Sequence, residues 1–183
     1  ALSLASGEWI LSIDADEVVP PGLADEIIAN VKTDHGFSGF WVKRKNMYKK
    51  QWIRYGGWWP DTILRVFRKG KGQFSNRRVH ESVEIDGNTK ELQAALEHYS
   101  YNGPEDFILK MHSYAMAGAR QMQDDGRTGG AIRAVIRAFA AFVKGYILKR
   151  GFLDGRAGLL IAASGAIGVF YKIIKLSELN ERP

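Results

Sequence analysis

The chain has 183 residues and a mass of 20.5 kDa, and 45% of its residues are apolar while 25% are charged. This composition is typical of a globular protein of one or two domains and excludes a disordered or collagen-like chain. Cysteine is absent, which excludes a disulfide framework, thiolate metal ligands and a cysteine nucleophile. The first residues lack the basic start of a signal peptide, and we expect none in this sequence.

The charge is unevenly distributed along the chain. Residues 1–109 hold 14 Lys and Arg against 15 Asp and Glu, whereas residues 110–183 hold 12 against 5. The net charge of +6 therefore comes entirely from the C-terminal two-fifths. A basic excess confined to one region favours a polyanionic partner, either a nucleic acid or an anionic membrane surface.

The first half of the chain predicts short strands and one helix. The apolar run at residues 9–13 predicts a buried strand, and residues 3–7 before it predict the end of a helix. A break at Pro20-Pro21-Gly22 precedes a predicted helix at residues 23–31. Further strands are expected from alternating or short apolar runs at residues 39–45, 63–68, 79–85 and 92–101.

The pattern changes after Gly103-Pro104. Helical periodicity and the intervening glycines predict three helices, at residues 106–123, 131–148 and 156–179. We therefore expect the α/β fold class, with a domain at residues 1–103 that is followed by an all-helical region at residues 104–183.

Acidic residues follow the first predicted strand directly, in the tetrapeptide Asp14-Ala15-Asp16-Glu17. Open α/β sheets bind ligands at the carboxyl ends of strands, and alternate residues of an extended chain point the same way. Asp14 and Asp16 could therefore share Mg²⁺ or Mn²⁺, which prefer oxygen ligands and would neutralise a diphosphate. The alternative is a solvated acidic turn before the two prolines, since D-x-D is a short pattern.

Longer segments carry a family resemblance. WILSIDADEVVPPGL resembles the D-x-D segment of family 2 glycosyltransferases with the GT-A fold. The similarity continues in GGWWPDTILRVFRKGKGQFSNRRVHESV, in HYSY and in GYILKRGFLDGRAG, and so covers nearly the whole chain. Within this family the chain looks most similar to the bacterial enzymes that build lipopolysaccharide core and related surface glycans.

The resemblance implies the C-terminal part of a GT-A catalytic domain. In the family a nucleotide-binding half precedes the D-x-D segment, which here stands at residue 14. We expect this chain to lack that half, to bind donor weakly, and to leave a sheet edge unpaired, which favours self-association. The resemblance also implies inverting transfer of a sugar from a nucleotide-sugar donor to a lipid-linked saccharide acceptor, with Asp14 on the nucleotide side and Asp16 on Mg²⁺ or Mn²⁺.

The segment Trp58-Trp59-Pro60-Asp61 precedes a predicted strand. Inverting transfer needs a general base for the acceptor hydroxyl, and the resemblance assigns that catalytic role to Asp61. The alternative is an aspartate that caps a turn. Trp58 and Trp59 are candidate sugar platforms, but adjacent strand residues face opposite ways, so at most one is expected in the pocket.

Two histidines and two arginines are further candidates. The resemblance implies that a later histidine completes the metal or pyrophosphate site, with His80 as first choice and His98 as second. Arg77 and Arg78 could bind diphosphate oxygens. The alternatives are structural histidines and solvated arginines at a strand edge.

The helical tail combines apolar and basic residues. Residues 131–150 hold five cations and no acid, and their apolar residues follow helical spacing, which is typical of a helix lying in a membrane interface. Residues 157–171 carry no charge but form a run too short to cross a bilayer comfortably. The alternative is that both helices pack on the catalytic half. The resembling family acts at the cytoplasmic face of the inner membrane, which implies a peripheral location there.

These observations favour a glycosyltransferase over two alternatives. One is a non-catalytic module whose tail docks on a membrane or a nucleic acid. We expect no nucleic acid, because the tail carries a large aliphatic stripe where nucleic-acid surfaces interleave basic and polar residues. The other alternative is a fragment that is inactive by itself and serves in assembly.

Overall fold

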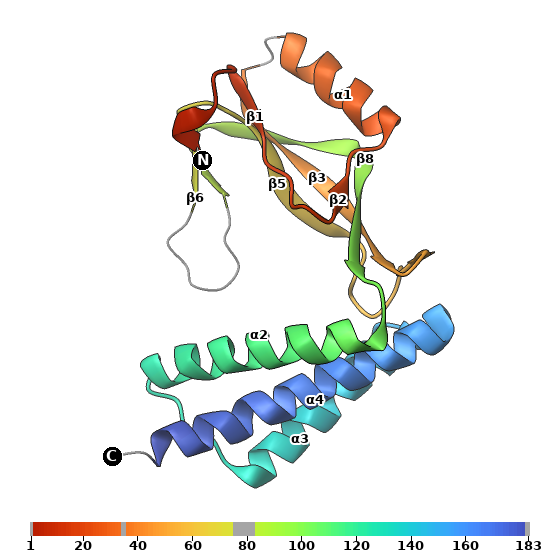
Figure 1. The fold of residues 1–183 in the computed structure, drawn as a ribbon, viewed down its shortest axis with the longest axis vertical. Coiled ribbons are helices and arrows are strands. Elements are labelled where there is room, and N and C mark those ends of the chain that lie inside the picture. Colours follow the sequence, from red (N-terminus) through yellow and green to blue (C-terminus); the bar gives the residue numbers. More distant parts are fainter. Residues whose placement is uncertain (1, 34–35, 75–82, 182–183) are drawn as a thin grey trace. The chain divides into compact units, whose positions relative to one another are not determined.

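The structure is a computed structural model that describes residues 2–33, 36–74 and 83–181. The chain divides into two compact units (Figure 1). The first unit comprises Ala1–Met47 and Pro60–Ser100, and the second comprises Tyr48–Trp59 and Tyr101–Pro183. The mixed α/β class is as predicted, whereas the GT-A type stays a prediction. Tyr48–Trp59 groups with the helices, which a linear division at residue 103 does not include.

The first unit is built on a sheet with the strand order β1-β5-β3-β8-β2. Three of its pairs are antiparallel, namely β1 with β5, β3 with β5, and β2 with β8. The strands are Trp9–Leu11 (β1), Glu17–Val18 (β2), Phe37–Tyr48 (β3), Asp61–Arg68 (β5) and Asn88–Tyr101 (β8), and Gln51–Trp52 (β4) pairs with β3. A separate antiparallel pair joins Gly72–Phe74 (β6) to Val83–Ile85 (β7).

Helix α1, Pro21–Lys32, packs on this sheet and closes the core. It begins with a proline, which fits the first helical position because the N–H of that position has no partner within the helix. Leu23 of α1 is 1% exposed and packs among alternate residues of the strands. The other fully enclosed members of this core are Phe40, Val42, Val66, Leu92 and Leu96.

Two predictions for the N-terminal residues are wrong in detail. The first strand ends at Leu11 instead of residue 13, and Leu11 and Ile13 are both exposed. The reason is that β1 stands at the end of the strand order and pairs with β5 alone among the described strands. Residues 3–7 do not end a helix, because only the short 3₁₀ turn η1, Leu2–Leu4, forms there.

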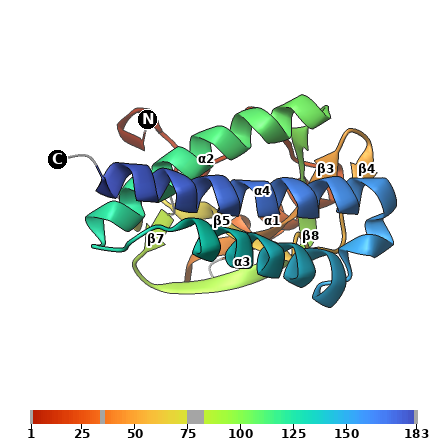
Figure 2. The ribbon, with the colours of Figure 1, turned by 90° about the horizontal axis from the view of Figure 1, so that it is seen from below.

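The second unit contains three long helices. They are α2, Pro104–Asp124, α3, Ala131–Phe142, and α4, Gly155–Asn180. Figure 2 shows α4 running between α2 and α3, and it packs against both. All three were predicted, and the helical structure expected over residues 131–148 is confirmed. Its last part, η2 (Val143–Leu148), is a π-helix, in which Lys149 N–H donates to Lys144 C=O at 2.9 Å, five residues back.

The turn η3, Gly151–Asp154, joins the π-helix to α4 and explains why Tyr48–Trp59 belongs to the second unit. The buried Asp154 carboxylate accepts the backbone N–H groups of Arg54 at 3.1 Å and Tyr55 at 2.8 Å. These are charge-assisted hydrogen bonds, which are stronger than neutral ones. The backbone is also closely packed here, because a Cβ on Gly158 would collide with the Gly151 carbonyl oxygen.

The segment Gly151–Asn180 is long and apolar enough to cross a membrane, judged by length and composition. The sequence led us to expect a run too short for this, since Arg156 and Lys172 bound the uncharged residues. The helix continues past both charges, which lengthens it. Because core helices of soluble proteins can pass the same test, this finding is only weakly compatible with membrane association.

Candidate functional site

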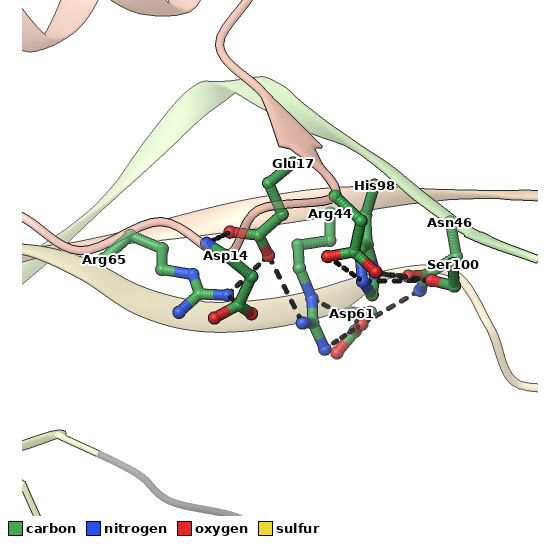
Figure 3. A network of polar contacts seen from close by, with 9 residues as sticks. Asp14, Glu17, Arg44, Asn46, Asp61, Arg65, His98 and Ser100 are labelled. Carbon is green, nitrogen blue, oxygen red and sulfur yellow. Dashed lines mark hydrogen bonds and ion pairs between the residues drawn. The ribbon is translucent and has the colours of Figure 1, made fainter. Parts of the chain in front are cut away.

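Polar side chains gather at one end of the sheet in the first unit (Figure 3). Alternate residues of a strand share a face, and the face of β3 that lines the core continues into Arg44 and Asn46. The core-lining face of β8 continues in the same way into His98 and Ser100. One face of the sheet is therefore apolar under α1 and polar further along.

Strand pairing brings acidic residues to this polar end. Asp61, the first residue of β5, lies opposite Arg44 of β3. Glu17 of β2 lies opposite His98 of β8. The turn between β1 and β2 closes with a hydrogen bond of 3.1 Å from Glu17 N–H to the carbonyl of Asp14. We call the resulting set the polar cluster, and its members are Asp14, Asp16, Glu17, Arg44, Asn46, Asp61, Arg65, His98 and Ser100.

Glu17 is the buried centre of the polar cluster. Its side chain is fully enclosed and contacts the guanidinium groups of Arg65 and, at 3.5 Å, of Arg44. Arg65 also contacts the carboxylate of Asp14. Burial by itself would lower the pKa of Arg65, but hydrogen bonds to Glu17 and Asp14 outweigh it and raise that pKa. Arg65 therefore stays charged and ties the acidic turn to β5.

Asp61 is held by two neighbours on β3. Its Oδ2 atom accepts from Arg44 Nε at 2.9 Å, from the second guanidinium nitrogen of Arg44 at 2.8 Å, and from Asn46 Nδ2 at 2.9 Å. All three donors described here reach the same oxygen. Among the described residues, these donors hold the carboxylate through Oδ2.

Asn46 also determines which ring nitrogen of His98 carries a proton. Because its Nδ2 donates to Asp61, its Oδ1 is the atom that lies 2.6 Å from His98 Nδ1. An amide oxygen only accepts, so Nδ1 carries a proton. In neutral His98 the lone pair is then on Nε2, which lies 3.5 Å from Asp16 Oδ1. Ser100 Oγ also contacts the ring, 2.8 Å from Nδ1 and 3.0 Å from Nε2.

Carboxylates outnumber guanidinium groups in the polar cluster. It holds four carboxylates and two guanidinium groups, together with the imidazole of His98. Asp14 and Asp16 have different described partners, Arg65 and His98. Both aspartates are about half exposed, so an incoming cation or substrate can reach them.

The donor atoms of Asp16 and His98 suit a divalent cation that substrate helps to bind. A carboxylate oxygen and an imidazole Nε2 are ligands that Mn²⁺ accepts. Mg²⁺-type sites commonly use one or two carboxylates together with substrate phosphates and water. The described residues contain no group of three or more acidic or histidine side chains that could hold a metal by itself. The pair therefore fits a site that a diphosphate completes.

The two tryptophans lie in the second unit. Trp58 lines a cavity of about 290 Å³ with aromatic walls, where its ring lies 5.5 Å from that of Tyr101. Tyr101 in turn stacks on Phe107 with a ring separation of 3.9 Å. Trp59 instead packs edge-on against Trp52 at 5.1 Å. Of the two tryptophans, Trp58 lines this cavity, and the role of either ring as a sugar platform stays a prediction.

Three predicted site residues, Arg77, Arg78 and His80, lie outside the described residues, so their roles stay predictions. His98, the second choice among the histidines, is part of the polar cluster together with Asp14, Asp16 and Asp61. Sequence reasoning brought these four into one site without naming the residues that connect them.

Four connecting residues were missed, namely Glu17, Arg44, Asn46 and Arg65. Their signal is present in the sequence but is indirect. Arg65 interrupts the apolar run Ile63-Leu64-Arg65-Val66-Phe67, and a charge at such a position needs a buried partner. The polar residues of β3 and β8 continue apolar faces, which is visible only once both strands are paired.

No protein family model matches the chain. Curated relatives do exist among Rickettsia proteins. The chain is 27% identical over 192 residues to an uncharacterized glycosyltransferase of Rickettsia bellii, and 26% identical over 192 residues to one of Rickettsia typhi. An uncharacterized glycosyltransferase of Rickettsia prowazekii is 25% identical over 198 residues.

Each alignment covers 98% of this chain and 65% of the relative, so the chain spans about two-thirds of the length of these relatives. The similarity supports a glycosyltransferase role in general terms. Membership of family 2 and of the lipopolysaccharide branch stays a prediction. Along almost its whole length, the chain is similar to bacterial proteins named glycosyltransferases.

Proposed function

We propose that this protein is a metal-dependent, inverting glycosyltransferase of the family 2 type that uses a nucleotide-sugar donor. The observation that carries the proposal is the polar cluster, in which a half-exposed Asp16, the mostly buried His98 beside it and the anchored carboxylate of Asp61 belong to one polar network. Similarity to proteins named glycosyltransferases supports the same reaction class.

The residues of the acidic turn would receive the donor. Asp16 and His98 Nε2 would hold Mg²⁺ or Mn²⁺, whose charge would neutralise the diphosphate of the donor. Asp14 would lie on the nucleotide side, where Arg65 keeps its carboxylate in place. Arg77, Arg78 and His80 are candidates for further contacts with the diphosphate.

Asp61 would act as the general base. Arg44 and Asn46 hold its Oδ2, so its Oδ1 would take the proton of the acceptor hydroxyl. The hydroxyl oxygen would then form a bond to the anomeric carbon while the bond to the diphosphate oxygen breaks. Attack from the side opposite the leaving group inverts the configuration at that carbon.

A lipid-linked saccharide is the acceptor that we propose, in the synthesis of a lipopolysaccharide-type surface glycan. Support comes from the family resemblance and from the long apolar helix α4 in a strongly basic part of the chain. Trp58 would serve as a sugar platform, since a flat apolar ring face stacks well on a pyranose. The location that fits this acceptor is the cytoplasmic face of the inner membrane.

The test is a screen of nucleotide sugars with Mn²⁺ against the full-length protein, with release of nucleoside diphosphate as the readout. We expect Asp16→Ala and Asp61→Ala each to lower kcat at least about 100-fold, because both remove groups needed in the transition state. Asp86→Asn is the matched control, since this exposed aspartate pairs with Lys71 away from the polar cluster. Full turnover in both alanine variants would show that the site is assigned wrongly.

A docking module without catalysis is the second candidate, because helix α3 exposes large apolar side chains that no described residue covers. Vesicle binding by the full-length protein without turnover of any donor would favour it. Turnover that depends on Asp16 and Asp61 would exclude it.

A further inference from the structure

Helix α3 packs with its small side chains inward and its large apolar side chains outward. Ala134 is completely buried, and Ala138 and Ala141 are partly buried on the same side. On the opposite side Ile132 and Phe139 are 79% and 71% exposed. A helix of a water-soluble core normally shows the reverse arrangement.

Helix α4 extends this apolar surface. Its exposed Ile167 and Phe170 line a shallow groove of about 380 Å³ together with Val135, Phe139 and Phe142 of α3. The remaining residues that line the groove are alanines. The outward sides of α3 and α4 therefore form one continuous apolar surface, which we call the outer face.

Cations line the other flank of α3. A groove of about 340 Å³ between α2, α3 and α4 is lined by five basic side chains and no acidic one. These five are Arg127, Arg133, Arg137, Lys144 and Lys172. Residues 126–153 hold six cations and no carboxylate, and among the five lining cations Arg127 pairs with Asp125 at 3.8 Å.

The contact between the helices is also of the kind found in membranes. A Cβ on Gly145 of the π-helix would lie 3.9 Å from Ala162 Cβ of α4, so small residues face each other there. Helices in lipid associate through small residues and turn large apolar side chains to the hydrocarbon. A nucleic acid would match the cations but not the adjacent apolar surface.

We propose that the outer face docks on an anionic lipid bilayer, with α3 lying in the plane of the interface. Its large apolar side chains would enter the acyl boundary, and the long basic side chains beside them would reach the lipid phosphates. The charge of this surface selects this occupant, because a cationic flank beside an apolar face complements anionic headgroups above hydrocarbon. The proposal does not depend on glycosyl transfer.

Sedimentation with vesicles tests it directly. We expect the chain to bind vesicles of phosphatidylcholine with 30% phosphatidylglycerol in 0.1 M NaCl, to bind pure phosphatidylcholine at least about 10-fold more weakly, and to be released by 0.5 M NaCl. Binding that survives this salt wash would indicate a helix that crosses the bilayer and would overturn docking in the plane.

Matched variants separate the apolar and the basic contributions. Ile136→Ser with Phe139→Ser should reduce the partition coefficient at least 10-fold, whereas Leu109→Ser on α2 should not, although Leu109 is 67% exposed. Arg133→Gln with Arg137→Gln should reduce the partition coefficient about 25-fold, because each cation near the surface contributes roughly a factor of five. Arg120→Gln, an exposed cation on α2, is the control.

Because the chain has no cysteine, a single cysteine can be introduced to test which face of α3 meets the lipid. A purely structural role of α3 would not give the result expected here. An environment-sensitive fluorophore on Ile136→Cys or Ile167→Cys should shift to the blue on anionic vesicles, and the same label on Leu109→Cys should not. Equal shifts at all three positions would overturn the proposed face. A dimer in light scattering that is lost in the Phe139→Ser variant, without vesicle binding by the unmodified chain, would show that a second copy covers the face instead.

Discussion

Glu17 shows how one buried carboxylate organises the candidate site. It is enclosed between two arginines, whereas its sequence neighbours Asp14 and Asp16 are about half exposed. A buried charge is tolerated only when it is paired, so Arg65 and Arg44 are required as partners of Glu17. Asp14 and Asp16 keep about half of their side-chain surface exposed, so a ligand can reach them.

We expect Glu17→Gln to lower the free energy of unfolding by about 3 kcal/mol, because removing one charge of a buried pair leaves the other uncompensated. Urea denaturation followed by circular dichroism measures this change. Glu8→Gln is the control, since Glu8 also pairs with an arginine, Arg68 at 2.7 Å, but is largely exposed. That surface pair should contribute less than about 1 kcal/mol. Equal effects of the two substitutions would contradict the central place of Glu17.

Asn46 is a positioning residue on our proposal, because it orients both His98 and Asp61. We expect Asn46→Ala to raise the Mn²⁺ concentration that gives half-maximal transfer by about 10-fold or more, since partners that orient a metal-ligating histidine typically contribute 10- to 100-fold to metal affinity. A titration of activity with Mn²⁺ measures this shift. A fall in kcat with no change in the Mn²⁺ dependence would show that Asn46 acts through Asp61 alone.

Among the elements, β8 shows best why the sequence reveals one part of the structure and conceals another. Its alternating pattern predicts a strand, and residues 92–101 are confirmed within Asn88–Tyr101. Its partner β2 has two residues, which is too short for any periodic signal. The helices were predicted because proline or glycine marks their boundaries and their apolar spacing extends over several turns. The polar cluster depends on pairs such as Glu17 with Arg65, which are 48 residues apart in the sequence. A local sequence pattern does not show which residues so far apart come into contact.

Tyr101 ends β8 and gives the second unit a pH-dependent stability. Burial, with smaller contributions from Tyr114 and Asp106, raises the pKa of Tyr101 to about 12 from an ordinary value of 10.0. The unfolded chain then loses this proton at lower pH than the folded chain, so the free energy of unfolding falls as pH rises from 10 towards 12.

Urea denaturation at pH 9 and pH 11 tests this titration. The unmodified chain should lose more stability between these two values than Tyr101→Phe, which has no phenol to ionise. Tyr55→Phe, in the same unit, should behave like the unmodified chain. An identical loss in the Tyr101→Phe variant would assign the effect to other groups.

At the scale of the whole molecule, charge follows the division into units. The first unit holds 11 basic and 13 acidic residues, and the second holds 15 basic and 7 acidic residues. The net charge of the second unit is therefore +8, and that of the first is −2. The sequence indicated such a division, although it could not show that Tyr48–Trp59, with three cations, adds to the basic unit.

We expect the two proposed activities to separate along the same division. Leu96→Ala in the core of the first unit should lower the free energy of unfolding by about 2–5 kcal/mol, because it leaves a cavity among residues that are fully enclosed. Donor turnover should then fall at 37 °C, while vesicle binding at 10 °C should remain unchanged. Parallel loss of both activities at both temperatures would show that the units do not fold separately.

The inward alanines of α3 have a consequence for how the protein exists before it meets its substrate. A helix that buries little more than methyl groups gains only a small hydrophobic stabilisation from its own bundle, so much of its favourable energy is available to an outside phase. In the absence of a lipid bilayer, the exposed isoleucine and phenylalanine side chains of α3 remain in contact with water. On the docking proposed above, this exposed apolar surface would therefore favour transfer of the chain from water to an anionic bilayer.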